Sequence, residues 1–212
     1  MPCLKLFSLA FAIAFDKIGK MIVGNSSYTA AVGDQLQACA PPRGGHLLAG
    51  EAVAEARAQV AEILAVADQY FNILPEAGLE VRRVEPWREN STSIAFYNLT
   101  SEDGSRPGIY YANMKDMENF QKYVFTAITY HESVPGHHFQ IANAMELQDI
   151  PEFRKQAGYG AYTEGWALYA EQLAREMGFY QDPMRNFGRL QDETGVHPAA
   201  VIANRVLPTR FS

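Results

Sequence analysis

The sequence lacks a long hydrophobic run. Its most apolar stretch, Leu6 to Phe15, is too short to cross a membrane as a helix, so we expect no membrane span. The stretch resembles a short signal peptide, but Asp16 and Lys17 follow it where a small-residue cleavage pattern would stand. A buried or amphipathic starting helix explains the same residues equally well. The sequence therefore leaves open a periplasmic, exported or cytoplasmic location.

Cysteine and positive charge are also scarce. The 2 cysteines, Cys3 and Cys39, could pair after export or stay reduced in the cytosol, and neither is near the histidine motif described below. The chain has 18 Lys and Arg against 24 Asp and Glu, a formal net charge of -6. An acidic chain has no electrostatic attraction for nucleic acid or for an anionic membrane, so we expect neither as a partner.

The chain does have enough apolar residues for a core, at 48% of its 212 positions. Residues 1–50 are poorly patterned, residues 51–197 carry the regular patterns and residues 198–212 form a tail, which indicates one main domain. Helical periodicity predicts helices over 51–74, 117–130, 162–177 and 183–193. Alternating apolar residues predict strands over 79–84, 93–99 and 109–112. We expect an α+β fold, mainly α-helical, with a small antiparallel sheet.

The stretch that carries the most chemistry runs from Tyr130 to Gln140 and reads Tyr-His-Glu-Ser-Val-Pro-Gly-His-His-Phe-Gln. It holds three of the 5 histidines in the chain, His131, His137 and His138, with Glu132 beside the first. Neutral imidazoles and a nearby carboxylate are the parts of a zinc site that activates water, in which the carboxylate takes the proton. The stretch therefore predicts one zinc ion, with Glu132 as general base.

The spacing differs from the H-E-x-x-H motif, in which histidines at i and i+4 share one helix face. On a regular helix His137 would lie roughly 120° around the axis from His131, and His138 would lie about 10 Å along it. Pro135 breaks a regular helix and Gly136 tolerates a bulge, so residues that loop out would shorten the path. Two such residues make His137 the ligand and three make His138. We favour His137, with His138 supporting a ligand or facing the substrate.

A third ligand is expected downstream, in the run from Ala161 to Glu171. Thr163 could cap a helix whose first turn carries Glu164, and Glu164 would then approach the metal from a second helix. Glu171 lies about two turns further along the same face, where it suits the role of holding a ligand histidine through its other ring nitrogen. The alternative is a Pro-Gly turn between two helices, with histidines that are exposed or locally satisfied and an acidic residue that the helix N-terminus favours.

These residues carry a resemblance to a known family. The run from Tyr130 to Gln140, followed by Tyr162-Thr-Glu-Gly-Trp-Ala-Leu-Tyr-Ala-Glu171, resembles the bacterial domain-of-unknown-function family 885. Similar blocks stand at Arg83 to Arg88, Arg106 to Asn113 and Met177 through Glu193. That family resembles the gluzincin metallopeptidases, so the resemblance implies a gluzincin-like core of zinc-binding helices.

The resemblance also implies roles for individual residues. It implies zinc ligands at His131, His137 and Glu164, and a general base at Glu132. Tyr159 or Tyr162 would donate a hydrogen bond to the developing oxyanion, with Tyr162 the residue we select. The segment from Tyr110 to Asn113 resembles the edge strand that pairs with an extended substrate backbone. The implied substrate is a peptide or a related small amide.

Two departures from the family pattern bear on activity. Members that resemble this chain are several hundred residues long, so we expect a shortened C-terminal half here. Glu193 joins Thr194 directly, where the family continues into an arginine-containing helix, so the position of His197 relative to the zinc is not fixed. Two functions follow: a zinc-dependent hydrolase of peptide or related amide bonds, or a catalytically inactive binding or structural module. A partner or oligomer would cover the apolar surface of a shortened core.

Overall fold

The computed structural model describes residues 49–101, 105–115, 122–148, 150–156 and 158–195. The chain divides into two units, 1–43 and 44–212, and every described residue belongs to the second. The apolar stretch from Leu6 to Phe15, both cysteines and His197 lie outside the described residues. Within the part that is described, no helix is both long and apolar enough to cross a membrane.

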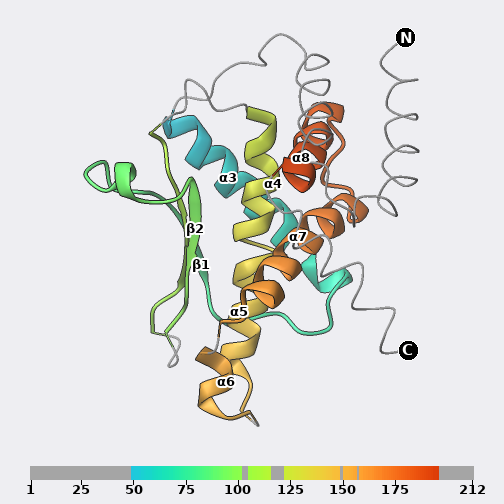
Figure 1. Cartoon of the computed structure of the whole chain (residues 1–212). Coiled ribbons are helices and arrows are strands. Elements are labelled where there is room, and N and C mark those ends of the chain that lie inside the picture. Colours follow the sequence, from blue (N-terminus) through green and yellow to red (C-terminus); the bar gives the residue numbers. More distant parts are fainter. Residues whose placement is uncertain (1–48, 102–104, 116–121, 149, 157, 196–212) are drawn as a thin grey trace, which may run out of the picture. The chain divides into compact units, whose positions relative to one another are not determined.

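Helices make up most of the described structure (Figure 1). They are α3 (Ala49–Leu64), α4 (Lys122–Glu132), α5 (His137–Glu146), α6 (Glu152–Gln156), α7 (Gly160–Glu176) and α8 (Pro183–Gly195). Single 3-10 turns occur at Ala67–Gln69 and Glu89–Ser91. The first predicted helix ends at Leu64 and not at 74, because the chain turns there and brings Phe71 against Phe139 of α5, with ring centroids 4.4 Å apart.

The three strands are β1 (Leu79–Arg83), β2 (Ala95–Asn98) and β3 (Gly108–Ala112), in the spatial order β1-β3-β2. β3 pairs in parallel with β1 and antiparallel with β2, so the sheet is mixed and the predicted antiparallel sheet was wrong in this respect. Every residue of β3 is buried, whereas β1 and β2 expose part of their residues. A continuous buried run is typical of a central strand, which explains why β3 lies between the other two.

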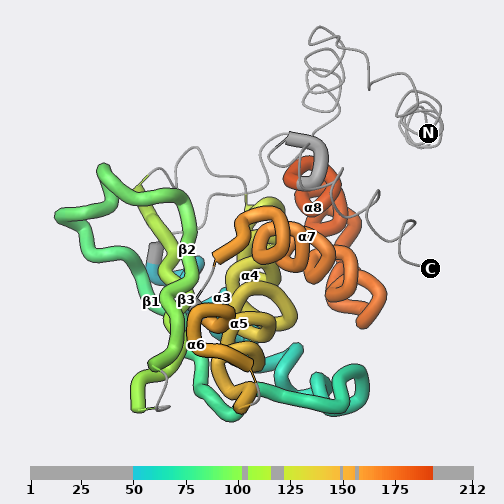
Figure 2. Tube along the Cα trace, turned by 60° about the horizontal axis from the view of Figure 1, so that its bottom comes forward, coloured from blue at the N-terminus to red at the C-terminus, as the bar shows by residue number. Residues whose placement is uncertain are grey.

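Helix α4 is the central element of this fold. Figure 1 shows the sheet on one side of α4 and α7 and α8 on the other, and Figure 2 shows the same order from a second direction. On the sheet side, α4 and α3 close a core with the inner face of the sheet, whose buried members are Ala52, Ala56, Val60, Val81, Ala95, Tyr110, Ala112, Met114 and Phe125. On the other side, a second core joins Tyr130 of α4 to residues of α3, α5 and α7. The end of α4 is therefore held on both sides.

A sharp break separates α4 from α5. α4 ends at Glu132, residues 133–136 form a turn, and α5 begins at His137. The chain thus forms two helices joined by a Pro-Gly turn, which was the alternative to a helix that bulges or kinks at Pro135. Pro135 has no N–H to continue the helix. Gly136 packs so closely that a Cβ there would overlap the carbonyl oxygen of His131. The absence of a side chain at Gly136 is what lets the turn close against the end of α4.

Gly136→Ala should destabilise the protein by about 3 kcal/mol, because the added methyl group would meet backbone atoms that have no freedom to move. Gly50→Ala is the matched control, since Gly50 has open space around its α-carbon in α3 and alanine is the better helix former. Urea unfolding followed by circular dichroism measures both. Equal midpoints for Gly136→Ala and the wild type would contradict this account of the turn.

Candidate metal centre

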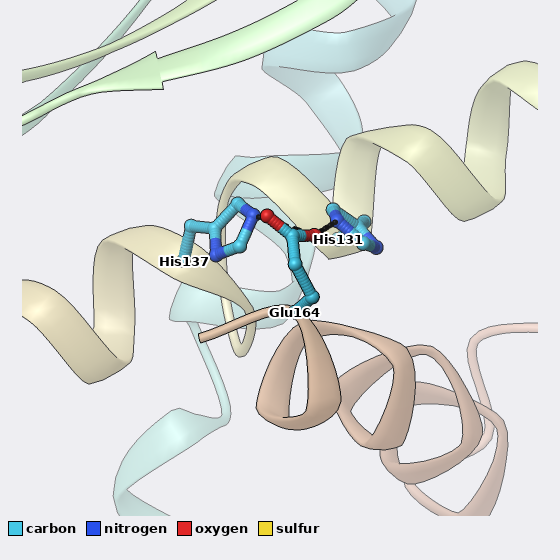
Figure 3. Close-up of side chains that lie close together, drawn as sticks. All are labelled: His131, His137 and Glu164. Atoms are coloured by element: carbon cyan, nitrogen blue, oxygen red, sulfur yellow. Dashed lines mark hydrogen bonds and ion pairs between the residues drawn. The ribbon is translucent and has the colours of Figure 1, made fainter. Parts of the chain in front are cut away.

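Three side chains from three helices converge at this break (Figure 3). His131 lies in the last turn of α4, His137 is the first residue of α5, and Glu164 lies near the start of α7. Oε2 of Glu164 is 3.2 Å from Nε2 of His131 and 3.6 Å from Nε2 of His137. One ligand atom from each residue falls within 4.8 Å of the other two. Both imidazoles therefore present the same ring nitrogen to one carboxylate.

Trp166 joins the turn at residues 133–136 to helix α7. Its indole N–H donates a hydrogen bond of 2.8 Å to the carbonyl of Pro135, and Trp166 lies two residues after Glu164 on α7. The carbonyl of a proline at a helix break has no helical partner, so an outside donor is needed to satisfy it. This bond joins the segment between the two histidines to the helix that carries the carboxylate.

Glu171 contacts His131 at Nδ1, the ring nitrogen that does not face Glu164. Its Oε1 is 2.9 Å from Nδ1 of His131, and its side chain is only 1% exposed. Burial raises the pKa of Glu171 to about 7, although the bond to His131 acts in the opposite direction. Burial by itself would lower the pKa of His131, but hydrogen bonds to Glu164 and Glu171 outweigh it and raise this pKa to about 10. The histidine is therefore a proton site between two carboxylates, and a metal ion would have to replace that proton at Nε2.

The surroundings of Glu164 favour its charged form, whereas those of Glu132 disfavour it. Hydrogen bonds from both histidines hold the pKa of Glu164 well below its usual range. Glu132 is buried, with 7% of its surface exposed, and burial raises its pKa. Its Oε2 is buried and has no hydrogen-bond partner among the described residues. A carboxylate of raised pKa beside the three converging groups is suited to accept and return a proton.

His138 faces away from this cluster. Its Nδ1 is 3.0 Å from the hydroxyl of Tyr97 on β2, and burial lowers its pKa to about 4, so the ring is neutral. Gly108 of β3 makes room for this pair, because a Cβ at that position would overlap the tyrosine hydroxyl. Of the two histidines that the sequence left as alternatives, His137 is the one that the structure brings to His131 and Glu164.

The comparisons with known proteins agree with the motifs. The sequence matches the bacterial family described as "Bacterial protein of unknown function (DUF885)" over residues 13–203. The chain belongs to this family. A solved structure, "The crystal structure of the putative lipoprotein from Colwellia psychrerythraea", is similar with a TM-score of 0.69 and 36% sequence identity. The similarity covers 77% of this chain but only 29% of that one. A search of curated proteins found no match.

In this DUF885 member, the segment from Tyr110 to Asn113 does not form the edge strand that we predicted. β3 is the central strand, so its backbone groups are used by β1 and β2 and cannot pair with a substrate. The side chain of Tyr110 is fully buried. The prediction of an edge strand was wrong, because the order of strands in a sheet depends on non-local pairing.

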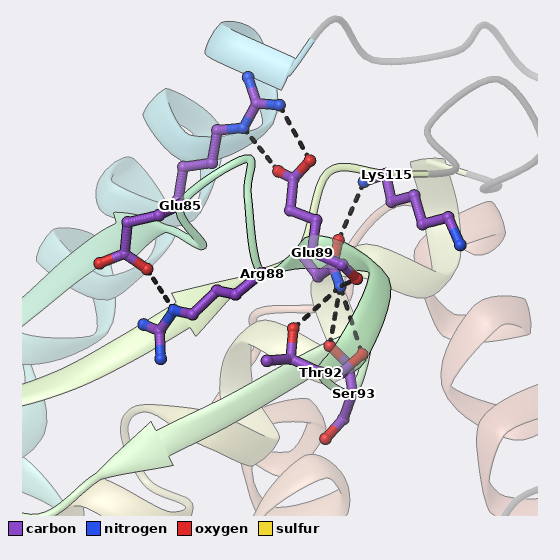
Figure 4. A network of polar contacts seen from close by, with 8 residues as sticks. Glu85, Arg88, Glu89, Thr92, Ser93 and Lys115 are labelled. Atoms are coloured by element: carbon purple, nitrogen blue, oxygen red, sulfur yellow. Dashed lines mark hydrogen bonds and ion pairs between the residues drawn. The ribbon is translucent and has the colours of Figure 1, made fainter.

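Asn113 instead bonds to members of a polar network, in which Glu89, Thr92 and Lys115 lie close together (Figure 4). Its Nδ2 donates to the carbonyl of Glu89 at 2.7 Å and to Oγ1 of Thr92 at 3.2 Å, and its Oδ1 accepts the N–H of Lys115 at 3.0 Å. The carboxylate of Glu89 accepts two hydrogen bonds from Arg83, the shorter of them 2.7 Å. Asn113 thus joins the loop that holds Glu89 and Thr92 to the segment that follows β3, and both ends of its carboxamide make hydrogen bonds there.

The two candidate oxyanion donors lie at the start of α7. Tyr159 precedes the helix and Tyr162 is in its first turn, with 69% and 64% of their surfaces exposed. Residues two apart on a helix point about 200° from one another, so Tyr162 and Glu164 leave the helix on different sides. Among the described residues, no hydrogen bond joins either hydroxyl to His131, His137 or Glu164. A tyrosine donor to an oxyanion stays a prediction.

Trp166, Tyr97 and Gln140 support the site but were not predicted from the sequence. Trp166 could have been suspected, because the N–H of a buried indole usually finds an acceptor. Tyr97 and Gln140 had no local signal, because each meets its partner across a large sequence separation. Gln140 donates its amide hydrogen to the carbonyl of Tyr162 at 3.3 Å.

Trp166→Phe should lower the free energy of unfolding by about 1 kcal/mol, because the aromatic body stays but the carbonyl of Pro135 loses its donor. Tyr169→Phe, which removes a hydroxyl from a half-exposed ring on the same helix, should change it by less than about 0.5 kcal/mol. Denaturant titration of the metal-free protein checks both variants. The bond is unimportant if the two behave alike.

Proposed function

We propose that this chain binds one zinc ion and hydrolyses a peptide or related amide bond. The observation that carries the proposal is the convergence of two imidazole Nε2 atoms and one carboxylate oxygen beside the buried carboxylate of Glu132. Two histidines and a glutamate are a known ligand set of catalytic zinc, which keeps a further coordination position for water or substrate.

The two distances from Glu164 to the histidines fit such an ion. Ligand atoms placed tetrahedrally about 2.0–2.1 Å from zinc are separated from one another by about 3.4 Å. The two separations between Glu164 and the histidines, 3.2 Å and 3.6 Å, bracket that value. His131 is supported through its other nitrogen by Glu171, as ligand histidines commonly are. The donor set and its support therefore suit zinc.

The exposure of the ligands favours a catalytic site over a purely structural one. His131 and His137 expose about a tenth of their side chains, whereas Glu164 exposes 44% of its own. A structural zinc is enclosed by protein ligands, and a catalytic zinc needs one side open to solvent. The half-exposed carboxylate places an open side at the start of α7.

The residues of the chain would divide the reaction among them. Zinc, when bound, would act as a Lewis acid toward the scissile carbonyl and toward water. Glu132 would take a proton from the attacking water at its unpartnered Oε2 and return it to the leaving amine, a role that its raised pKa favours. Glu171 would hold the ring of His131 in one orientation throughout.

Elemental analysis of the purified protein should find one zinc per chain, and His131→Ala should lose it. His138→Gln is the matched control, because His138 bonds Tyr97 and does not face the ligand cluster. This variant should keep one zinc even if it is less stable. Wild-type protein that stays free of zinc after incubation with the metal would refute the proposed function. Loss of zinc from both variants would show that His138 had been wrongly excluded as a ligand.

Glu132→Gln should keep the zinc and lower the rate of hydrolysis by roughly 100- to 10,000-fold, because the amide cannot accept the proton. A mixture of quenched fluorescent peptides supplies the substrate screen, and a chelator should abolish the wild-type signal. Zinc binding without chelator-sensitive cleavage of any peptide or amide would favour an inactive binding or structural module.

A further inference from the structure

Gln140 lies one turn along α5 from His137, with 8% of its surface exposed. Its Nε2 donates to the carbonyl of Tyr162 in the first turn of α7. Since only the nitrogen end of a carboxamide can donate to a carbonyl, this bond fixes which end is the oxygen. That oxygen, Oε1, is buried and has no hydrogen-bond partner among the described residues. A buried acceptor without a donor is uncommon and calls for an explanation.

The same helix also carries a buried ring nitrogen that has no hydrogen-bond partner among the described residues. His137 turns its Nε2 toward Glu164, and its Nδ1 is buried without a hydrogen-bond partner in the described part of the chain. His131 differs, because its Nδ1 meets Glu171. Among the described residues, Nδ1 of His131 therefore has a supporting partner and Nδ1 of His137 has none.

The two residues that carry these atoms share one face of α5, because residues three apart are neighbours on a helix surface. His137 and Gln140 also both contact the N-terminal part of α7, through Glu164 and the carbonyl of Tyr162. A neutral imidazole whose Nε2 binds a metal must carry its proton on Nδ1, which makes Nδ1 an obligatory donor. One helix therefore carries, three residues apart, a buried oxygen that lacks a donor and a buried nitrogen that needs an acceptor.

We propose that Gln140 is the positioning residue of His137, accepting the Nδ1 proton at Oε1 while its Nε2 holds the start of α7. It would do for His137 what Glu171 does for His131, and it would link His137 to the helix that carries Glu164. The inference rests on the proposed zinc site, but it gives Gln140 a role that the proposed function does not assign to it.

Zinc affinity gives the first test. Gln140→Leu should weaken zinc binding by about 10- to 100-fold, measured by competition with a chromophoric chelator. Gln140→Glu restores an acceptor at the same place and should recover most of that loss. Asn143→Leu is the matched control: Asn143 lies one turn further along α5, donates to the carbonyl of Phe139, and also has a buried, unpartnered amide oxygen. Its zinc affinity should equal that of the wild type.

The position of the proton gives a test that a merely structural role would not move. In zinc-loaded wild-type protein labelled with ¹⁵N-histidine, NMR should show the His137 proton on Nδ1 and exchanging slowly with solvent. In Gln140→Leu the same proton should exchange faster, whereas the Nδ1 proton of His131 should be unchanged. If Gln140→Leu does not fold, the wild-type spectrum still decides, because a His137 proton that exchanges as freely as in an exposed imidazole would overturn the proposal.

The outcomes separate this inference from the proposed function. Wild-type protein that binds no zinc would refute the zinc site itself. Wild-type protein that binds zinc, together with a Gln140→Leu variant of equal affinity and an equally protected His137 proton, would overturn only the role of Gln140.

Discussion

The break between Glu132 and His137 is the constraint on which the rest of the site depends. An unbroken helix would turn the two histidines to different sides, roughly 120° apart. The observed turn instead stops α4 directly after His131 and starts α5 at His137, so both imidazoles reach the carboxylate of Glu164. Close backbone packing at Gly136 and the hydrogen bond from Trp166 to Pro135 hold the turn in that form.

Helix α7 supplies the other half of the arrangement. Glu164 and Glu171 are two turns apart on one face, and each meets a different nitrogen of His131. Burying carboxylates is costly unless they are paired and hydrogen-bonded. The imidazole offsets that cost for the buried Glu171 at Nδ1, while its Nε2 meets the half-exposed Glu164. The same pairing fixes the orientation of the ring, which a metal ligand requires.

Several parts of this description could be predicted from local sequence. The relation between Glu164 and Glu171 follows from helical periodicity alone, and the strand segments follow from alternation. The choice between His137 and His138 could not be made in this way, because it depends on how many residues the turn takes up. The central position of β3 was also beyond local reasoning, since its partners lie on either side of it only after distant segments have paired. The edge strand expected at Tyr110 to Asn113 was wrong for that reason.

The sequence by itself determined the family, the helices that carry the motif and the chemical types of the candidate ligands. These depend on residue identity and on repeats of a few residues, which a linear chain displays directly. The tertiary structure decided which ring nitrogen faces which carboxylate, which histidine turns to the sheet, and which strand takes the centre. Those outcomes come from packing between segments far apart in the sequence, where α4 is enclosed by the sheet and α3 on one side and by α7 and α8 on the other.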